Sequence, residues 1–200
     1  VATVGDVMDL QGENRIIVKE GLRQLSATHT PGLRALIRAN NLDGAEITAY
    51  HVGFVLGPCI NASGRLDTAA RSLELLCETN EERAAELAGD LLALNQSRKA
   101  MTEKGKEEAI RLIEETGLNE DRVLVVYLPD CHESLAGIIA GRIREKYHKP
   151  VFVLTKGENS VKGSGRSIEA YSMYEEMVKC GDLLIQFGGH PMAAGLSLPE

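Results

Sequence analysis

The sequence feature that most constrains the fold is a helical pattern from about residue 80 to residue 116 with a polar middle. Thr79 and Glu82 stand three residues apart, which is the spacing of a capping box and predicts a helix start. Apolar residues recur at helical spacing on both sides of the segment 95–108, which is almost wholly polar. A helix over this range would be about 55 Å long at 1.5 Å per residue. We predict a connector between two domains, because a long helix with a polar middle is typical of a solvent-bridging element.

This helix divides the chain into three zones, residues 1–66, 67–118 and 119–200. In the first zone we expect a buried strand end at 1–7, helices at 14–25 and from Pro31 through Ile37, a short helix capped by Thr48, and turns at 53–58 that lead to a polar loop at 61–66.

The third zone has the pattern of an α/β domain. The continuous apolar run 123–128 predicts a strand buried on both faces. We further expect a helix at 134–147, strands at 151–154 and 161–167, a helix at 173–180 and an apolar helical turn at 183–187. The order strand, helix, strand, strand, helix places the chain in the α/β class.

Composition indicates a packed protein with reduced thiols. The hydrophobic fraction is 44%, which is enough for a core. No apolar run approaches the ~18 residues of a membrane span, and the first residues do not resemble a signal peptide. The four cysteines form no C-x-x-C pair, so a zinc site is disfavoured and a cytoplasmic protein is expected.

The distribution of charge leaves room for a local anion site. The formal net charge is −7, and residues 68–118 hold 11 acids and 7 bases, or −4, so the other segments together carry −3. This excludes a broad basic surface but not a local phosphate site. With three Phe, five Tyr and no Trp, a stacking platform for bases is disfavoured, and any nucleic acid would be held through phosphates and sugars.

Two segments of the third zone carry candidate binding chemistry. Lys162–Ser167 combines glycines, hydroxyls and Arg166, which suits a phosphate, although glycines in a strand can also mark a bulge. Gly188 and Gly189 permit close backbone approach, and His190 can donate to a phosphate. The alternative for the second segment is a tight turn into a helix of small residues with His190 inside.

Single polar residues elsewhere are weaker candidates. Asp6 ends a predicted strand, where carboxylates often hold metals, although a lone Asp more often caps a helix. The segment 61–66 resembles many polar loops. His132 follows the first strand of the third zone at a position that could face a ligand, whereas the adjacent Cys131 is not expected to act with it as a nucleophile.

Together these segments resemble the RecJ family of the DHH/DHHA1 phosphoesterases. The resemblance covers the whole chain in order: residues 2–10 resemble the late T-V-A-D motif, 56–66 the L-G-P-x-(I/L)-N-A-x-G-R-(L/I) motif, His132 with 137–140 the first DHHA1 motif, 163–167 the G-S-x-R-S motif, and 188–195 the G-G-H-x-x-A-A-G motif. Cys59 stands where the family frequently has Arg. The aspartate-rich and D-H-H motifs are not in the sequence, so we expect a fragment.

The resemblance implies a fold, an activity and roles for these residues. It predicts the end of a DHH catalytic domain at 1–66, a helical connector at 67–118 and a DHHA1 substrate-binding domain at 119–200. The intact protein would be a 5′-to-3′ single-stranded-DNA exonuclease of repair and recombination that uses Mn²⁺ or Mg²⁺. The implied roles are metal binding by Asp6 and contacts to DNA or its phosphates by Asn61, Arg65, His132, Ser164, Arg166, Gly188, Gly189 and His190.

The resemblance also implies partners and leaves alternatives open. We expect a monomer that binds single-stranded DNA, with no membrane partner, and that works with a single-stranded-DNA-binding protein and a helicase. The fragment alone is predicted to be inactive. One alternative is a phosphodiesterase for short oligonucleotides or cyclic dinucleotides, against which the connector and the 61–66 motif count. The other is a binding or scaffold module without a metal site.

Overall fold

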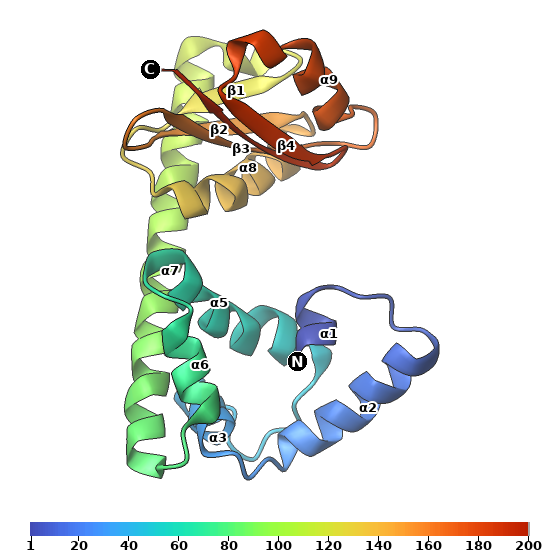
Figure 1. Cartoon of the computed structure of the whole chain (residues 1–200), viewed down its shortest axis with the longest axis vertical. Helices are drawn as coiled ribbons and strands as arrows, with labels where there is room; N and C mark the ends of the chain where they lie inside the picture. Colours follow the sequence, from blue (N-terminus) through green and yellow to red (C-terminus); the bar gives the residue numbers. More distant parts are fainter. Residues whose placement is uncertain (200) are drawn as a thin grey trace. The chain divides into compact units, whose positions relative to one another are not determined.

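The computed structural model describes residues 1–199, and the chain divides into two compact units, Val1–Arg98 and Lys99–Glu200 (Figure 1). Helix α7 (Glu81–Thr116) has 36 residues and contributes to both units, so the predicted long helix is confirmed. Among the described residues, no helix is long and apolar enough to span a membrane. The domain boundaries predicted at 66 and 118 stay predictions.

The first turn of α7 begins slightly later than the sequence predicted. Asn80 is the capping residue, because its Oδ1 accepts a hydrogen bond of 2.9 Å from the backbone N–H of Arg83. Glu78 holds the preceding turn by accepting from the backbone N–H groups of Thr79 and Asn80 at 2.7 and 2.8 Å. The predicted capping box at Thr79 and Glu82 is therefore wrong by one residue.

The first unit is helical throughout. Its elements are α1 (Ala2–Gly5), α2 (Gly12–Ser26), α3 (Pro31–Ala39), α4 (Ala49–His51), a π-helix η1 (Val52–Leu56), α5 (Gly57–Leu66), α6 (Ala70–Cys77) and the first half of α7. Its core contains the fully buried side chains Leu36, Leu56, Leu75 and Leu91. The predicted Pro31 helix start and the short helix after Thr48 are confirmed.

Two predictions for the first unit are wrong. Residues 1–7 contain helix α1 in place of a strand end, because the unit has no strand with which they could pair, and the N–H groups of Gly5 and Asp6 bond to carbonyls four residues earlier. The expected turns and polar loop at 53–66 are helical. Pro58 lies in the first turn of α5, where a missing N–H costs little. Gly57 is needed there, because a Cβ would lie 2.7 Å from the carbonyl oxygen of Val52.

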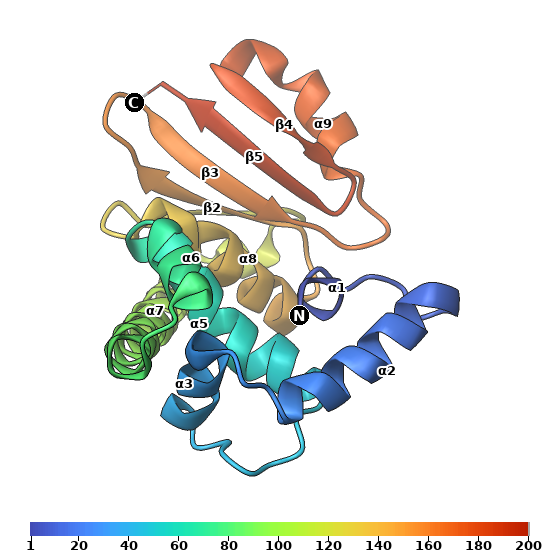
Figure 2. The same ribbon diagram turned by 60° about the horizontal axis from the view of Figure 1, so that its bottom comes forward.

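The second unit is a five-stranded mixed sheet with helices on its faces, which confirms the α/β class. Its main elements are β1 (Leu124–Tyr127), α8 (Glu133–Tyr147), β2 (Val151–Lys156), β3 (Val161–Arg166), α9 (Met173–Lys179), β4 (Gln186–His190) and β5 (Ala193–Leu198), with 3₁₀ turns η2 (Leu118–Glu120) and η3 (Gly181–Leu183). The strand order is β1-β2-β3-β5-β4, so β5 lies between β3 and β4 (Figure 2). Only β1 and β2 run parallel among the described strands.

Each face of this sheet has its own core. On one face, α8 and the end of α7 pack against Leu124, Val126, Val151 and Val153. On the other face, α9 packs its buried Met173 and Met177 against Phe152 and Ala194. Edge strand β1 alternates between buried and exposed positions, with Val125 and Tyr127 48% and 45% exposed. The prediction that it is buried on both faces is therefore wrong.

Residues 186–198 form a hairpin, whereas the sequence predicted a helical turn at 183–187, of which only Leu183 lies in a 3₁₀ turn. Gln186–His190 and Ala193–Leu198 pair antiparallel around Pro191 and Met192. Short apolar runs do not distinguish a buried helix turn from a strand by their periodicity. Here β5 also pairs with β3, so both edges of its backbone have hydrogen-bonding partners.

Candidate functional site

The face of the sheet that α8 covers in part collects polar side chains from four strands, β2, β3, β4 and β5. Side chains alternate along a strand, so Lys162, Ser164 and Arg166 of β3 point to the same face. The register places Ser164 opposite Gly195, and Gly195 opposite Gly188. The motifs at 162–167 and 188–195 therefore meet through β5.

The next cross-strand row contains the two side chains best suited to an anion. Arg166 lies opposite Ala193, and Ala193 lies opposite His190. Ala193 is small, so nothing long separates the guanidinium from the imidazole within the row. Four of the predicted site residues, Ser164, Arg166, Gly188 and His190, thus occupy two adjacent rows of one face.

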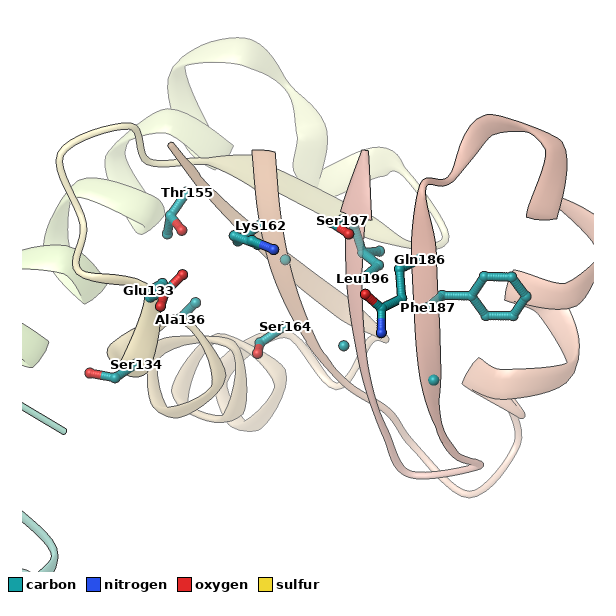
Figure 3. A pocket seen from close by; sticks show the side chains of 13 residues that line it. Glu133, Ser134, Ala136, Thr155, Lys162, Ser164, Gln186, Phe187, Leu196 and Ser197 are labelled. Atoms are coloured by element: carbon teal, nitrogen blue, oxygen red, sulfur yellow. The ribbon is translucent and has the colours of Figure 1, made fainter. Parts of the chain in front are cut away.

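A cavity of about 500 Å³ opens over this face beside α8 (Figure 3). Lys162, Ser164 and Gln186 reach it from the strands, while Glu133 and Ser134 reach it from the start of α8. The complete lining is Glu133, Ser134, Ala136, Thr155, Lys162, Gly163, Ser164, Gln186, Phe187, Gly188, Gly195, Leu196 and Ser197. This lining contains hydroxyl, amide and ammonium groups that can donate hydrogen bonds, and one carboxylate.

Arg166 is held against the backbone of α8. Its Nη1 donates to the carbonyl oxygen of Gly165 at 2.7 Å. A Cβ at Gly137 would lie 2.8 Å from Nη2 and 3.2 Å from the central guanidinium carbon. The guanidinium therefore occupies the space that a side chain at position 137 would take. The sequence placed Gly137 in a segment that resembles the first DHHA1 motif, but it did not predict the contact between Arg166 and this position.

His190 is exposed, and a backbone hydrogen bond fixes one of its ring nitrogens. Nδ1 accepts from the N–H of Met192 at 3.3 Å. In the neutral ring the proton is then on Nε2, which can donate to an anion.

Gly189 lies on the opposite face from its neighbours Gly188 and His190. It pairs with Ala194, which is buried. Its φ is 153°, and a Cβ would lie 2.4 Å from the carbonyl oxygen of Ala193. The hairpin therefore requires glycine at position 189. In the strand, this position faces away from the polar face.

His132 caps helix α8. Its Nδ1 accepts from the backbone N–H of Ser134 at 3.3 Å and lies 2.8 Å from the Ser134 hydroxyl. It also lines a second cavity, of about 700 Å³, with Lys156 and Lys162 among the other lining residues. The two cavities share Glu133 and Lys162, so His132 adjoins the polar face without lining the first cavity.

The remaining predicted residues belong to the first unit. Asp6 follows α1 and is exposed. Asn61 is exposed on α5, and Arg65 stands one helical turn later on the same helix. Within residues 1–199, no group of three or more His, Cys, Asp or Glu side chains is placed to hold a metal. Asp6 is therefore not part of a three-ligand group in the described part of the chain, and its surroundings there do not by themselves fit a metal centre.

The chain is similar to known proteins along its whole length. Residues 120–200 match the DHHA1 domain family. The whole chain is 40% identical to the single-stranded-DNA-specific exonuclease RecJ of Dickeya dadantii, of which it covers 36%. It is 36% identical to the protein of that name from Thermus thermophilus, of which it covers 28%. The chain thus spans about a third of the length of these curated relatives.

Solved structures of RecJ proteins are also similar to this chain. The crystal structure of RecJ from Thermus thermophilus in complex with Mg²⁺ superposes with a TM-score of 0.86 at 35% identity, over 99% of this chain and 30% of that one. The structure of the same protein in complex with Mn²⁺ also gives a TM-score of 0.86. The resemblance inferred from the sequence motifs is confirmed.

Proposed function

We propose a function from the premise that residues 120–200 belong to the DHHA1 domain family and that the whole chain is homologous to RecJ exonucleases. The protein that contains this chain hydrolyses phosphodiester bonds of single-stranded DNA from the 5′ end, in repair and recombination. The second unit holds a phosphate of the strand. The observation that carries this proposal is the pair of rows in which Ser164 and Arg166 face Gly188 and His190 across β5.

Each of these residues has a proposed task at the phosphate. Arg166 offers a planar fork of donors, which suits two phosphate oxygens. The hydroxyl of Ser164 and the Nε2–H of His190 donate from either side of the fork. Gly188 has nothing within 4 Å of a built Cβ, so the strand can approach its backbone. We further propose that His132, at the start of α8, and Gly189, through its backbone, border this site.

The metal chemistry belongs to the intact protein in this proposal. Solved relatives were crystallised in complex with Mg²⁺ and with Mn²⁺, and a divalent ion would activate water and stabilise the leaving oxygen. We propose Asp6 as one ligand, although its surroundings in the described chain do not complete a site. Asn61 and Arg65 would guide the strand. The proposed protein is a cytoplasmic monomer that acts with a single-stranded-DNA-binding protein and a helicase.

Arg166→Gln tests the phosphate site. We expect the affinity of the chain for a 5′-phosphorylated single-stranded 12-mer to fall about ten- to a hundredfold, the range of a hydrogen bond to a charged group. Arg142→Gln is the matched control, because Arg142 is an exposed arginine on α8 paired with Glu145. Fluorescence anisotropy measures both. Equal affinities of Arg166→Gln and the unmodified chain would disprove the assignment.

The chain by itself is expected to show no Mn²⁺-dependent digestion of single-stranded DNA, because Asp6 belongs to no group of three or more His, Cys, Asp or Glu side chains that could hold a metal among residues 1–199. Release of mononucleotides from a labelled strand, followed by gel electrophoresis, is the measurement. Measurable digestion by the pure chain, lost in Asp6→Asn, would show that the metal centre lies within it.

A second candidate is a phosphodiesterase for short oligonucleotides or cyclic dinucleotides. The cavity of about 500 Å³ beside Ser164 favours it, because a cavity of this size suits a small ligand. Competition of a dinucleotide against the 12-mer separates the two functions. Tighter binding of the dinucleotide would favour the small-substrate enzyme, whereas tighter binding of the 12-mer favours the exonuclease.

A further inference from the structure

The cavity extends beyond the proposed phosphate site into a third row of the same sheet face. In this row Thr155 lies opposite Lys162, Lys162 opposite Ser197, and Ser197 opposite Gln186. All four residues line the cavity (Figure 3), and none of them belongs to the phosphate site proposed above. The row therefore has its own set of polar groups.

Two of these groups have unused hydrogen-bonding capacity. Thr155 is 0% exposed, and its Oγ1 is one of two buried side-chain oxygens in residues 1–199 without a hydrogen-bond partner. Buried hydroxyls are normally satisfied, so this one calls for an explanation such as a ligand. Lys162, directly across from it, is exposed, and its ammonium group makes no hydrogen bond or ion pair within the described chain. Thr155 and Lys162 thus line the same cavity from adjacent strands, and the Lys162 side chain extends toward Ser197 and Gln186 (Figure 3).

The distance between the rows matches a chain of repeating phosphates. Lys162 and Ser164 are two residues apart on β3, which corresponds to about 6.6 Å along a strand. An extended polynucleotide advances by a similar length from one phosphate to the next. The cavity lining holds one ammonium, that of Lys162, and one carboxylate, that of Glu133. A phosphodiester with one negative charge is repelled less by that carboxylate than a terminal phosphate with two.

We propose that Lys162 and Thr155 form a second phosphate subsite, which holds the phosphodiester next to the phosphate at Ser164 and Arg166. The subsite rests on the function proposed above and adds to it. With this subsite, the second unit binds at least one internucleotide linkage in addition to the first phosphate. A dinucleotide then binds more tightly than a mononucleotide, and the difference depends on Lys162.

Isothermal titration calorimetry of the whole chain with a 5′-phosphorylated thymidine mononucleotide and the matching dinucleotide tests this subsite. We expect the dinucleotide to bind about three- to tenfold more tightly, as for a partly exposed charged contact. Lys162→Gln should remove that advantage and leave the mononucleotide affinity unchanged. Lys179→Gln is the matched control, because Lys179 is an exposed lysine of α9, which packs on the opposite face of the sheet, and it pairs with Glu176.

Thr155→Val gives an independent measurement. It keeps the shape of the side chain and removes an unsatisfied hydroxyl, so we expect the thermal stability to be kept or raised while the dinucleotide advantage shrinks. An unchanged advantage in both Lys162→Gln and Thr155→Val overturns the subsite, and so does equal binding of the two nucleotides by the unmodified chain. The effect of Arg166→Gln on mononucleotide binding tests only the phosphate site at Ser164 and Arg166. The dinucleotide advantage tests only the subsite at Lys162 and Thr155, so either proposal can be disproved without the other.

Discussion

At the scale of single residues, Arg166 keeps its position against α8 because residue 137 is glycine. We predict that Gly137→Ala lowers the affinity for a phosphorylated single strand about tenfold, because the new Cβ displaces the guanidinium and with it a charged hydrogen bond. Gly89→Ala is the control, since a Cβ there has nothing within 4 Å and should stabilise α7 by about 1 kcal/mol. Anisotropy and thermal melts of both variants are the measurements.

The same prediction has an internal check in a double-mutant cycle. In an Arg166→Gln background, Gly137→Ala should cost no further affinity, because its effect passes through the arginine. An equal loss in both backgrounds would mean that Gly137 affects binding in another way.

A thiol beside the polar face gives a prediction that depends on pH. Burial, and then the nearby carboxylate of Glu108, raise the pKa of the Cys131 thiol. The thiolate therefore forms at higher pH than in an ordinary cysteine. At about pH 8 we expect iodoacetamide to label Cys131 several-fold more slowly than the exposed Cys77, with a rate that rises further as the pH is increased.

Mass spectrometry of labelled peptides measures these rates. Glu108→Gln should lower the pKa of Cys131 and speed its labelling. Labelling of Cys131 as fast as Cys77 at about pH 8 would show that the thiol is not desolvated.

The sequence identified residues of the polar face by their side-chain chemistry but not by their geometry. Ser164, Arg166, Gly188 and His190 were predicted as binding residues, and the structure brings them to one face. Gly189 was assigned the same role, but strand alternation turns it to the other side. The sequence did not predict Thr155 as a binding residue, because a buried hydroxyl without a hydrogen-bond partner can be recognised only from the structure around it.

At the scale of elements, the close crossing of α3 and α6 depends on one glycine. A Cβ at Gly32 would lie 1.8 Å from the carbonyl oxygen of Leu75, which is backbone and cannot rotate away. We predict that Gly32→Ala destabilises the chain by about 1–3 kcal/mol or more. Gly21→Ala in α2, where a Cβ has nothing within 4 Å, should be neutral or stabilising. Urea denaturation measures both, and equal midpoints would contradict the prediction.

Elements were predicted well where they are long and poorly where they are short. The pattern over Glu81–Thr116 repeats often enough to identify a helix without any tertiary information. Residues 1–7 and 183–190 carry only a few apolar side chains each, and their structure depends on whether a partner strand is present. Residues 186–190 have one in β5, whereas residues 1–7 lie in an all-helical unit.

At the scale of the whole molecule, the net charge of −7 predicts a weak dependence of DNA binding on salt. If Arg166 and Lys162 each neutralise one phosphate, the logarithm of the association constant should fall with the logarithm of the salt concentration with a slope of about −1.4, or about −0.7 for each phosphate. Anisotropy titrations between about 50 and 200 mM salt give the slope. A slope near −4 or steeper would require a broad basic surface that the sequence lacks.

The α/β class and the long helix could be predicted from the sequence, but the strand order could not. The pattern predicted three strands in the second unit, whereas the structure has five, with β5 inserted between β3 and β4. Nothing in the local pattern of residues 193–198 indicates that this segment pairs on both sides. Such pairing is decided by contacts between residues far apart in the chain.

The position of β5 has a consequence for how the protein is made. A ribosome releases the chain from its first residue to its last, so Arg166 and His190 both emerge before Ala193–Leu198, the strand that joins them. Until that strand arrives, β3 and β4 each present an unpaired edge, which is the state most exposed to aggregation. A product that ended before residue 193 would therefore contain Arg166 and His190, which we propose to bind phosphate, but would lack the strand that lies between them.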